Sequence, residues 1–168
     1  MTHDIDRHWM DFALSLAEAA ALRNEVPVGA VVVHNGRLVG TGINLRESTM
    51  LASAHAEFLA MEEASRYLKA WRLQDCTLYV TLEPCLMCAG AIYQARIPRV
   101  VYGARDPKGG ALGSLFQLNS DTRLNHRYLV DEGLGAEESS KLLSGFFRMK
   151  RAKNKKAAAD IGAEEDDQ

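Results

Sequence analysis

The sequence is poor in the features that mark several large protein classes. It has no apolar run long enough to span a bilayer, and its first six residues lack the basic and apolar pattern of a secretory signal. Three cysteines among 168 residues are too few for the disulfide framework of a small secreted domain, and two of them form a Cys-x-x-Cys pair typical of metal ligation in a reducing compartment. We therefore expect a soluble, cytoplasmic protein that does not associate with membranes.

The sequence also lacks an overall excess of basic residues. Its formal net charge of −2 and its pI near 6.2 do not by themselves indicate a nucleic-acid partner. However, no acidic residue occurs between positions 139 and 159, and acids return only from Asp160 onward. The basic residues of this segment, called the basic stripe below, are Lys141, Arg148, Lys150, Arg151, Lys153, Lys155 and Lys156. Such a stripe suits contact with phosphates, although taken alone it is equally well explained as a solvated helix face.

The length and composition favour one domain. With 47% hydrophobic residues the chain can bury one substantial core, and 168 residues are few for two domains. We expect the domain to span residues 1–152. Residues 153–168, rich in lysine, alanine and then acids, can bury little apolar surface, so we expect a charged tail that is a frayed helix end or disordered.

Apolar spacing and turn residues predict alternating helices and strands after an initial β-hairpin. The hairpin is indicated by an Asn-Gly turn that follows a β-branched run and precedes a second strand. Strands are expected at 28–33, 37–41, 77–81, 100–102 and 126–130, and helices at the start of the chain up to 23–24, then at 54–70, 84–96 and 137–150. This alternation predicts an α/β protein with a mixed, largely parallel sheet covered by helices, whereas the strand order does not follow from the sequence.

Two short motifs supply ligands for one metal ion. His55 lies in His55-Ala56-Glu57, and Cys85 and Cys88 lie in Pro84-Cys85-Leu86-Met87-Cys88 at the start of a predicted helix. One imidazole and two thiolates suit tetrahedral zinc, and residues three apart on a helix share a face. Because no fourth ligand of matching type is evident, we expect a zinc ion that keeps a place for water, as catalytic zinc sites do.

Glu57 is the candidate proton carrier. It lies two residues from His55, a spacing that does not place both side chains on the same helical face, so we expect it to flank the ion without binding it. His-x-Glu followed by Pro-Cys-x-x-Cys resembles the signature of zinc-dependent nucleobase deaminases. That resemblance implies that Glu57 takes a proton from the activated water and protonates the ring nitrogen and then the departing ammonia of a base. A positioned acid/base of this kind contributes about 100-fold to 10,000-fold in rate.

Other functions remain open at this point. A Cys-x-x-Cys pair alone also occurs in redox motifs, but Pro84 and the distant His55-x-Glu57 favour catalytic zinc, since every part has a role in one mechanism. A deaminase of free nucleosides or bases would use the same zinc centre and would need no basic closing helix. A non-catalytic, zinc-stabilised RNA-binding module would need a fourth protein ligand.

With these residues, the sequence resembles the bacterial tRNA-specific adenosine deaminases of the cytidine deaminase-like superfamily. The resemblance extends from the first helix to about Arg151. The zinc signature is shared by several deaminases, and further motifs narrow the choice to tRNA: Glu25-Val26-Pro27-Val28-Gly29-Ala30, Asn44, Thr81-Leu82-Glu83-Pro84-Cys85, Gly103-Ala104-Arg105-Asp106-Pro107-Lys108, Asn125-His126-Arg127 and Phe146-Phe147-Arg148-Met149. The chain departs from the family before His55, where Leu51-Ala52-Ser53 replaces an acidic residue and proline, and Ser53 is expected to cap the helix.

The resemblance implies a three-layer α/β/α cytidine deaminase-like fold with a five-stranded sheet. It implies hydrolysis of adenosine to inosine at the wobble position of a tRNA anticodon, chiefly the arginine tRNA with anticodon ACG, with one zinc ion per subunit. It also implies a homodimer whose two subunits both contact the RNA, and it indicates no other protein partner.

The resemblance further assigns substrate contacts. Asn44 is expected to hydrogen-bond the flipped adenine, Val28 and Phe147 to line its pocket, and Asp106 to contact a ribose hydroxyl beside the target. A loop nucleotide leaves its stack at low cost, which suits this kind of recognition. One of the neighbouring phenylalanines, Phe146 or Phe147, is expected to be buried.

Three cations are candidates for phosphate contact. Arg105 and Lys108 lie in a glycine-rich loop at 103–114, and Arg148 belongs to the basic stripe. All three can reach a polyanionic substrate that occupies the zinc site.

Overall fold

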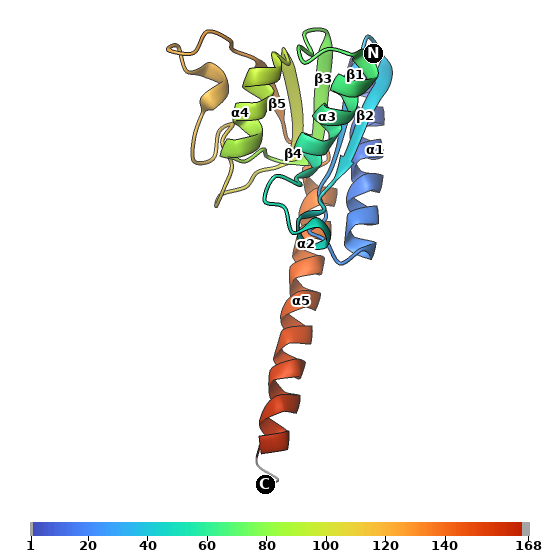
Figure 1. Ribbon diagram of the computed structural model, residues 1–168, viewed down its shortest axis with the longest axis vertical. Coiled ribbons are helices and arrows are strands. Elements are labelled where there is room, and N and C mark those ends of the chain that lie inside the picture. The colour runs from blue at the N-terminus through green and yellow to red at the C-terminus, as the bar shows by residue number, and fades with distance from the viewer. Residues whose placement is uncertain (1, 166–168) are drawn as a thin grey trace.

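The computed structural model describes residues 2–165 and the side chains of residues 4–157. Its elements in chain order are α1 (Thr2–Leu22), β1 (Gly29–His34), β2 (Arg37–Ile43), α2 (Arg46–Thr49), α3 (Ala56–Leu68), β3 (Cys76–Leu82), α4 (Leu86–Ala95), β4 (Arg99–Ala104), the 3-10 helix η1 (Leu118–Ser120), β5 (Leu129–Glu132) and α5 (Ala136–Glu165). The strands form one five-stranded sheet in the order β2-β1-β3-β4-β5 (Figure 1). β1 is antiparallel to β2 and β3, whereas the β3–β4 and β4–β5 pairs are parallel.

Helices cover both faces of the sheet, so the fold has three layers (Figure 1). One core lies between the sheet and the helices α3 and α4 and includes Val32, Ala60, Met61, Leu78, Val80, Ala89, Ile92 and Val100. The other lies between the sheet and α1, with part of α5 packed against it, and includes Met10, Ala13, Leu14, Val31, Tyr79 and Val101. Side chains alternate along each strand, so neighbouring residues of β1 enter opposite cores. Each large buried apolar side chain contributes about 1.5–3 kcal/mol, which makes these cores the main source of stability.

Two glycines of β2 let α3 approach the sheet closely. A Cβ atom at Gly40 would lie 2.2 Å from the carbonyl oxygen of Ala60, and one at Gly42 would lie 2.0 Å from that of Ala56. No side chain fits in these spaces, so glycine is required at both positions for the observed packing. The contact fixes the start of α3, and therefore the residues around Ala56, relative to the sheet.

The fold class expected from the sequence is confirmed, since a mixed five-stranded sheet is covered by helices on both faces. The expectation that the sheet is largely parallel is wrong. β1 lies between β2 and β3 and is antiparallel to both, so only two of the four pairings are parallel. The sequence does not predict the short elements α2 and η1, which contain four and three residues and are too brief to show a period.

Helix α5 continues to Glu165, beyond the expected end at residue 150. Figure 1 shows its C-terminal half extending past the sheet as a single helix, and residues 151–157 are all exposed. Residues 166–168 lie outside the described part of the chain, so the division into a domain (1–152) and a charged tail (153–168) stays a prediction. Within residues 2–165, no helix combines the length and apolar character needed to cross a membrane.

Candidate metal centre and active site

The candidate metal ligands and Glu57 lie at one edge of the sheet. At this edge β2, β3 and β4 end, β1 begins, and the crossover helices α3 and α4 start. The backbone N–H of Leu45, after β2, donates to the carbonyl oxygen of Ala54, before α3, at 3.0 Å. The carboxyl ends of parallel strands are the usual ligand site in open α/β sheets.

His55 and Cys85 occupy the residues immediately before α3 and α4. Both have extended backbone conformations, with φ −84° and ψ 150° at His55 and φ −73° and ψ 173° at Cys85. The expectation that both lie inside a first helical turn is therefore wrong by one residue, whereas Cys88 lies in the first turn of α4 as expected. Ser53 does not cap α3, because the N-cap position is His55, whose side chain makes no cap hydrogen bond.

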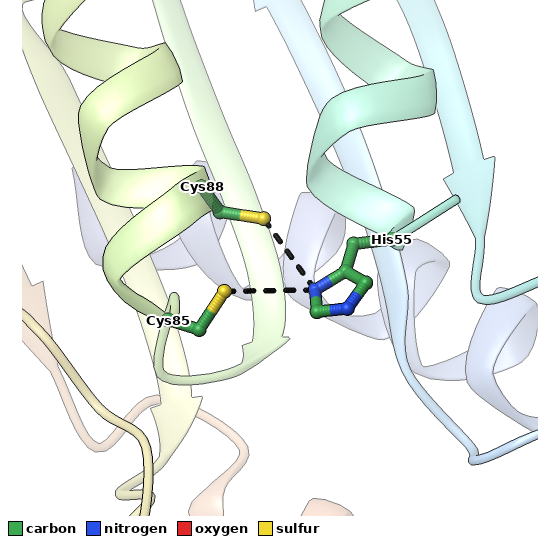
Figure 2. Close-up of side chains that lie close together, drawn as sticks. All are labelled: His55, Cys85 and Cys88. Carbon is green, nitrogen blue, oxygen red and sulfur yellow. Dashed lines mark hydrogen bonds between the residues drawn. The ribbon is translucent and has the colours of Figure 1, made fainter. Parts of the chain in front are cut away.

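The three side chains converge on one point (Figure 2). His55 Nδ1 lies 3.6 Å from the Sγ atoms of both Cys85 and Cys88. Tetrahedral zinc with bonds of about 2.0 Å to nitrogen and about 2.3 Å to sulfur requires a nitrogen–sulfur distance of about 3.5 Å. The spacing therefore fits zinc. Among the described residues, this cluster contains no fourth His, Cys, Asp or Glu, which is the composition of a centre with one open position.

Without a metal ion, one of the two cysteines is already in the thiolate form that binds zinc. The hydrogen bond from Cys88, reinforced by His55, lowers the pKa of the Cys85 thiol to about 4 against the opposing effect of burial. The same Cys85–Cys88 hydrogen bond and burial raise the pKa of Cys88, and the contact with Cys85 raises the pKa of His55. One thiolate thus lies beside one thiol, and a divalent cation deprotonates the thiols that coordinate it.

Glu57 lies in the first turn of α3, beside the cluster and outside it. Its side chain is 4% exposed. Burial raises the pKa of Glu57 to about 7, against the opposing effects of a backbone hydrogen bond and of His55. A carboxyl group that titrates near neutral pH can both accept and release a proton there, which is the property required of a general acid and base.

Two of the expected base-contacting residues lie together next to this site. The backbone N–H of Asn44 donates to the carbonyl oxygen of Val28 at 3.1 Å, and both residues are buried. The expectation for the phenylalanine pair is confirmed, because Phe146 is 5% exposed and packs in the interior, whereas Phe147 is 41% exposed.

The three residues of the glycine-rich loop that are expected to contact RNA have different surroundings. The Arg105 guanidinium donates to both carboxylate oxygens of Glu132, at 3.0 and 2.6 Å, and is therefore directed toward β5. Asp106 is half-buried and its Oδ1 accepts the backbone N–H of Lys108 at 3.0 Å. Lys108 itself is exposed, and so is Arg148 on α5.

Sequence reasoning missed the roles of two buried carboxylates, Glu25 and Glu83. Glu25 is 0% exposed and accepts hydrogen bonds from the backbone N–H of Ser48 at 2.6 Å, the Ser48 hydroxyl at 2.5 Å, the backbone N–H of Glu47 at 3.1 Å and Asn44 Nδ2 at 3.4 Å. It thus ties α2 and Asn44 together. Glu83 is 2% exposed and binds the glycine-rich loop in a similar way. The sequence did contain one signal, which is an acidic residue inside or beside an apolar run. Such a residue can be predicted to have partners, because acidic residues are rarely buried without them.

Replacing Glu25 with glutamine should lower stability in a pH-dependent manner. Burial alone would raise the pKa of Glu25, but hydrogen bonds from Ser48 and the backbone N–H of Glu47 lower it on balance below its ordinary value of 4.5. The stabilisation is therefore complete above about pH 4.5 and is lost as the pH falls through the lower folded-state pKa. Urea denaturation of Glu25→Gln should show a loss of about 1–3 kcal/mol at pH 7 and a smaller loss at pH 3.5. An equal loss at both pH values would contradict this account.

Comparison with known proteins identifies the family. The family of MafB19-like deaminases matches residues 5–151. The tRNA-specific adenosine deaminase of Bacillus subtilis is 46% identical over 156 residues, which cover 93% of this chain and 97% of that protein. The chain belongs to the MafB19-like deaminase family, among the tRNA-specific adenosine deaminases. The family expected from the sequence is therefore confirmed.

Solved deaminases share the fold. A structure from a study of A-to-I editing by tRNA:A34 deaminases at the wobble position superposes with a TM-score of 0.78 and 44% identity, covering 81% of this chain and 99% of that one. Guanine deaminase from Bacillus subtilis matches less completely, with a TM-score of 0.56 and 38% identity over 58% of this chain and 63% of that one. The more complete match is therefore to the deaminase that acts on tRNA.

Proposed function

We propose that this protein hydrolyses adenosine to inosine and ammonia at the wobble position of a tRNA anticodon, chiefly in the arginine tRNA with anticodon ACG. The observation that carries the proposal is the three-ligand cluster of His55, Cys85 and Cys88 beside buried Glu57, in a chain 46% identical to a tRNA-specific adenosine deaminase. The cluster has the ligand composition of a catalytic zinc centre.

The proposed mechanism divides the chemistry between one zinc ion per subunit and Glu57. When bound by the three ligands, zinc lowers the pKa of water and so supplies a nucleophile at neutral pH. Glu57 accepts one proton from the attacking water and passes it to the ring nitrogen of the adenine. After the amine-bearing carbon has become tetrahedral, Glu57 takes the second proton from the new hydroxyl group on that carbon and delivers it to the amino group, which leaves as ammonia. Burial, which raises the pKa of Glu57 to about 7, supports both halves of this role.

The proposed adenine pocket lies next to the metal centre. Asn44 hydrogen-bonds the flipped base, and Val28 and Phe147 line the pocket. The contact between Asn44 and Val28 and the exposure of Phe147 support this assignment. Asp106 contacts a ribose hydroxyl, which would favour RNA over DNA. Lys108 and Arg148 contact phosphates, and the ion pair with Glu132 makes Arg105 the weakest of the three phosphate candidates.

Binding to the anticodon stem-loop should depend steeply on salt if the basic stripe contacts phosphates. Removing one cation that neutralises a phosphate should reduce the slope of log K against log salt by about 0.7–0.9. The double variant Arg148→Gln, Arg151→Gln should therefore bind with a slope about 1.5 units shallower in a fluorescence-anisotropy titration. The charge-matched control is Arg66→Gln, Arg72→Gln, whose exposed residues lie at and beyond the C-terminal end of α3, away from the metal centre. Equal slopes for the two double variants would remove the stripe from the proposal.

The proposal includes a homodimer in the cytoplasm. The dimer rests on the family resemblance. The cytoplasmic location rests on the cysteines Cys76, Cys85 and Cys88, which form no disulfide and suit a reducing compartment. Sedimentation equilibrium should give twice the chain mass of 18.5 kDa. A monomer mass at micromolar concentration would contradict the dimer.

The direct test is to incubate the zinc-loaded protein with the anticodon stem-loop of the arginine tRNA and to measure inosine by mass spectrometry. We expect conversion of the wobble adenosine and far slower conversion of free adenosine. Equal rates on free adenosine or guanine would favour a deaminase of free nucleosides or bases, the class to which the partly matching guanine deaminase belongs. Tight RNA binding without any inosine would favour a non-catalytic binding module.

A further inference from the structure

Glu83 is a buried carboxylate that the proposed mechanism does not use. It follows the last residue of β3 and precedes Pro84 and the metal ligand Cys85. Its side chain is 2% exposed. A buried charge so close to a metal centre requires partners, because desolvation of an unpaired carboxylate is strongly unfavourable.

The hydrogen-bond donors to the Glu83 carboxylate come from the glycine-rich loop. Oε2 accepts the backbone N–H of Asp106 at 2.9 Å and the hydroxyl of Ser114. Oε1 accepts the backbone N–H groups of Leu112 at 3.1 Å and Ser114 at 3.0 Å. Four donors occupy the two oxygens. The carboxylate is therefore fully engaged with the loop.

The loop also lies directly against the segment that bears the metal ligand. The backbone N–H of Ala111 donates to the carbonyl oxygen of Pro84 at 2.9 Å, and Cys85 forms an isolated antiparallel bridge with Gly110. Gly110 passes so close to the carboxylate that a Cβ atom there would lie 2.2 Å from Glu83 Cδ. The glycine at this position is thus what lets the loop close around Glu83.

We propose that Glu83 is a positioning residue, which holds the loop of residues 105–114 at a fixed place relative to the metal centre so that Asp106 and Lys108 meet the RNA. It acts through the loop backbone, because its oxygens bind both the first part of the loop at Asp106 and the last part at Ser114. The RNA-binding half of this inference rests on the proposed function, whereas the loop-holding half does not.

The Glu83→Gln substitution should remove the acceptor of one loop N–H group and leave the others paired. The glutamine keeps one acceptor oxygen and replaces the other with an NH2 donor. With the NH2 group at the Oε2 position, the Ser114 hydroxyl can rotate to accept from it, and only the Asp106 N–H is left without its acceptor. The opposite orientation would leave both Leu112 and Ser114 N–H groups without acceptors, at greater cost.

Amide hydrogen exchange followed by NMR should therefore separate three amides. In Glu83→Gln, the Asp106 amide should exchange about tenfold faster, the factor expected when one hydrogen bond is removed, while the Leu112 and Ser114 amides change little. In Glu83→Ala, all three amides should exchange at least about tenfold faster. Gly110→Ala pushes the loop away from Glu83 from the loop side and should reproduce the Glu83→Ala pattern. It serves as the second variant if a Glu83 variant folds poorly.

Steady-state kinetics with the anticodon stem-loop distinguishes a positioning role of Glu83 from a role in the chemical step. We expect Glu83→Gln to raise KM about tenfold while kcat changes less than about threefold and one metal ion per chain is retained, because the loss is in substrate binding. Ser139→Ala is the control for general destabilisation. It removes a buried hydroxyl that donates to the carbonyl oxygen of Thr81 at 2.6 Å, on the α5 face of β3, and it should lower the melting temperature without raising KM.

The outcomes distinguish this inference from the proposed function. Unchanged exchange at Asp106, or a uniform acceleration of amides across the whole chain in Glu83→Gln, would overturn the loop-holding role even if the wild type makes inosine. Selective exchange with an unchanged KM would overturn the RNA-positioning role. If the wild type makes no inosine, the proposed function fails, yet the exchange pattern still decides whether Glu83 holds the loop.

Discussion

Replacing Glu57 with glutamine should reduce deamination by at least about 100-fold to 10,000-fold while the bound metal remains. Glu57 lies outside the His55, Cys85 and Cys88 cluster, so its removal leaves all three ligands in place. Loss of a positioned proton carrier affects kcat far more than KM, because the proton transfers occur in the transition state. Stopped assays of inosine formation under single-turnover conditions, together with metal analysis of the same sample, provide the measurement.

A melting-temperature measurement tests whether the Glu57→Gln variant is folded. The pKa of Glu57 is raised from its ordinary 4.5 to about 7 by burial, so the folded state binds an extra proton between these values. The carboxylate therefore opposes folding as the pH rises from about 4.5 through about 7. Metal-free Glu57→Gln should consequently melt at a higher temperature than metal-free wild type at pH 8, a gain often seen when an active-site charge is removed. Near-normal turnover, or loss of the metal, would show that Glu57 has been given the wrong role.

Replacing Cys88 with alanine should remove the metal and, with it, the activity. Even outer-shell partners of a metal ligand are worth about 10-fold to 100-fold in affinity, so loss of a direct ligand should weaken binding by at least about 100-fold. Cys88 is fully buried and lies 3.6 Å from His55 Nδ1, and within the described residues the cluster has no further ligand to replace it. Metal content after gel filtration should fall from one ion per chain to nearly none, and inosine formation should fall in proportion.

Cys76 provides a matched control within the same chain. It is also a buried free cysteine, but it lies at the start of β3 outside the ligand cluster, and burial raises the pKa of its thiol to about 11. Cys76→Ala should cost some stability through the small cavity and should keep its metal. Equal metal loss in the Cys76 and Cys88 variants would mean that the effect is one of folding and not of ligation.

The sequence is most informative where chemistry and local geometry coincide. The Asn-Gly turn predicted the β1–β2 hairpin, and the spacing of Cys85 and Cys88 placed two thiols at the start of α4, because both depend on a few neighbouring residues. His55, thirty residues before Cys85, was matched to them by chemical type and not by position. The placement of β1 between β2 and β3 depends on pairing between distant segments, which a single sequence does not encode locally.

The roles of the two buried carboxylates also depend on contacts between distant segments of the chain. Glu25 and Glu83 are single acidic residues whose partners lie 19 to 31 positions further along the chain. Most of those partners are backbone N–H groups, which carry no signature in the sequence. Their roles therefore became visible only when the loops around them were placed.

Gly42 restricts which substitutions the sheet can accept next to the candidate active site. The carbonyl group that would collide with any side chain at Gly42 belongs to Ala56, the residue between His55 and Glu57. A methyl group added at position 42 would therefore displace both of these neighbours at once. Substitution is consequently restricted from the sheet side of this centre, because position 42 has room only for the hydrogen of glycine.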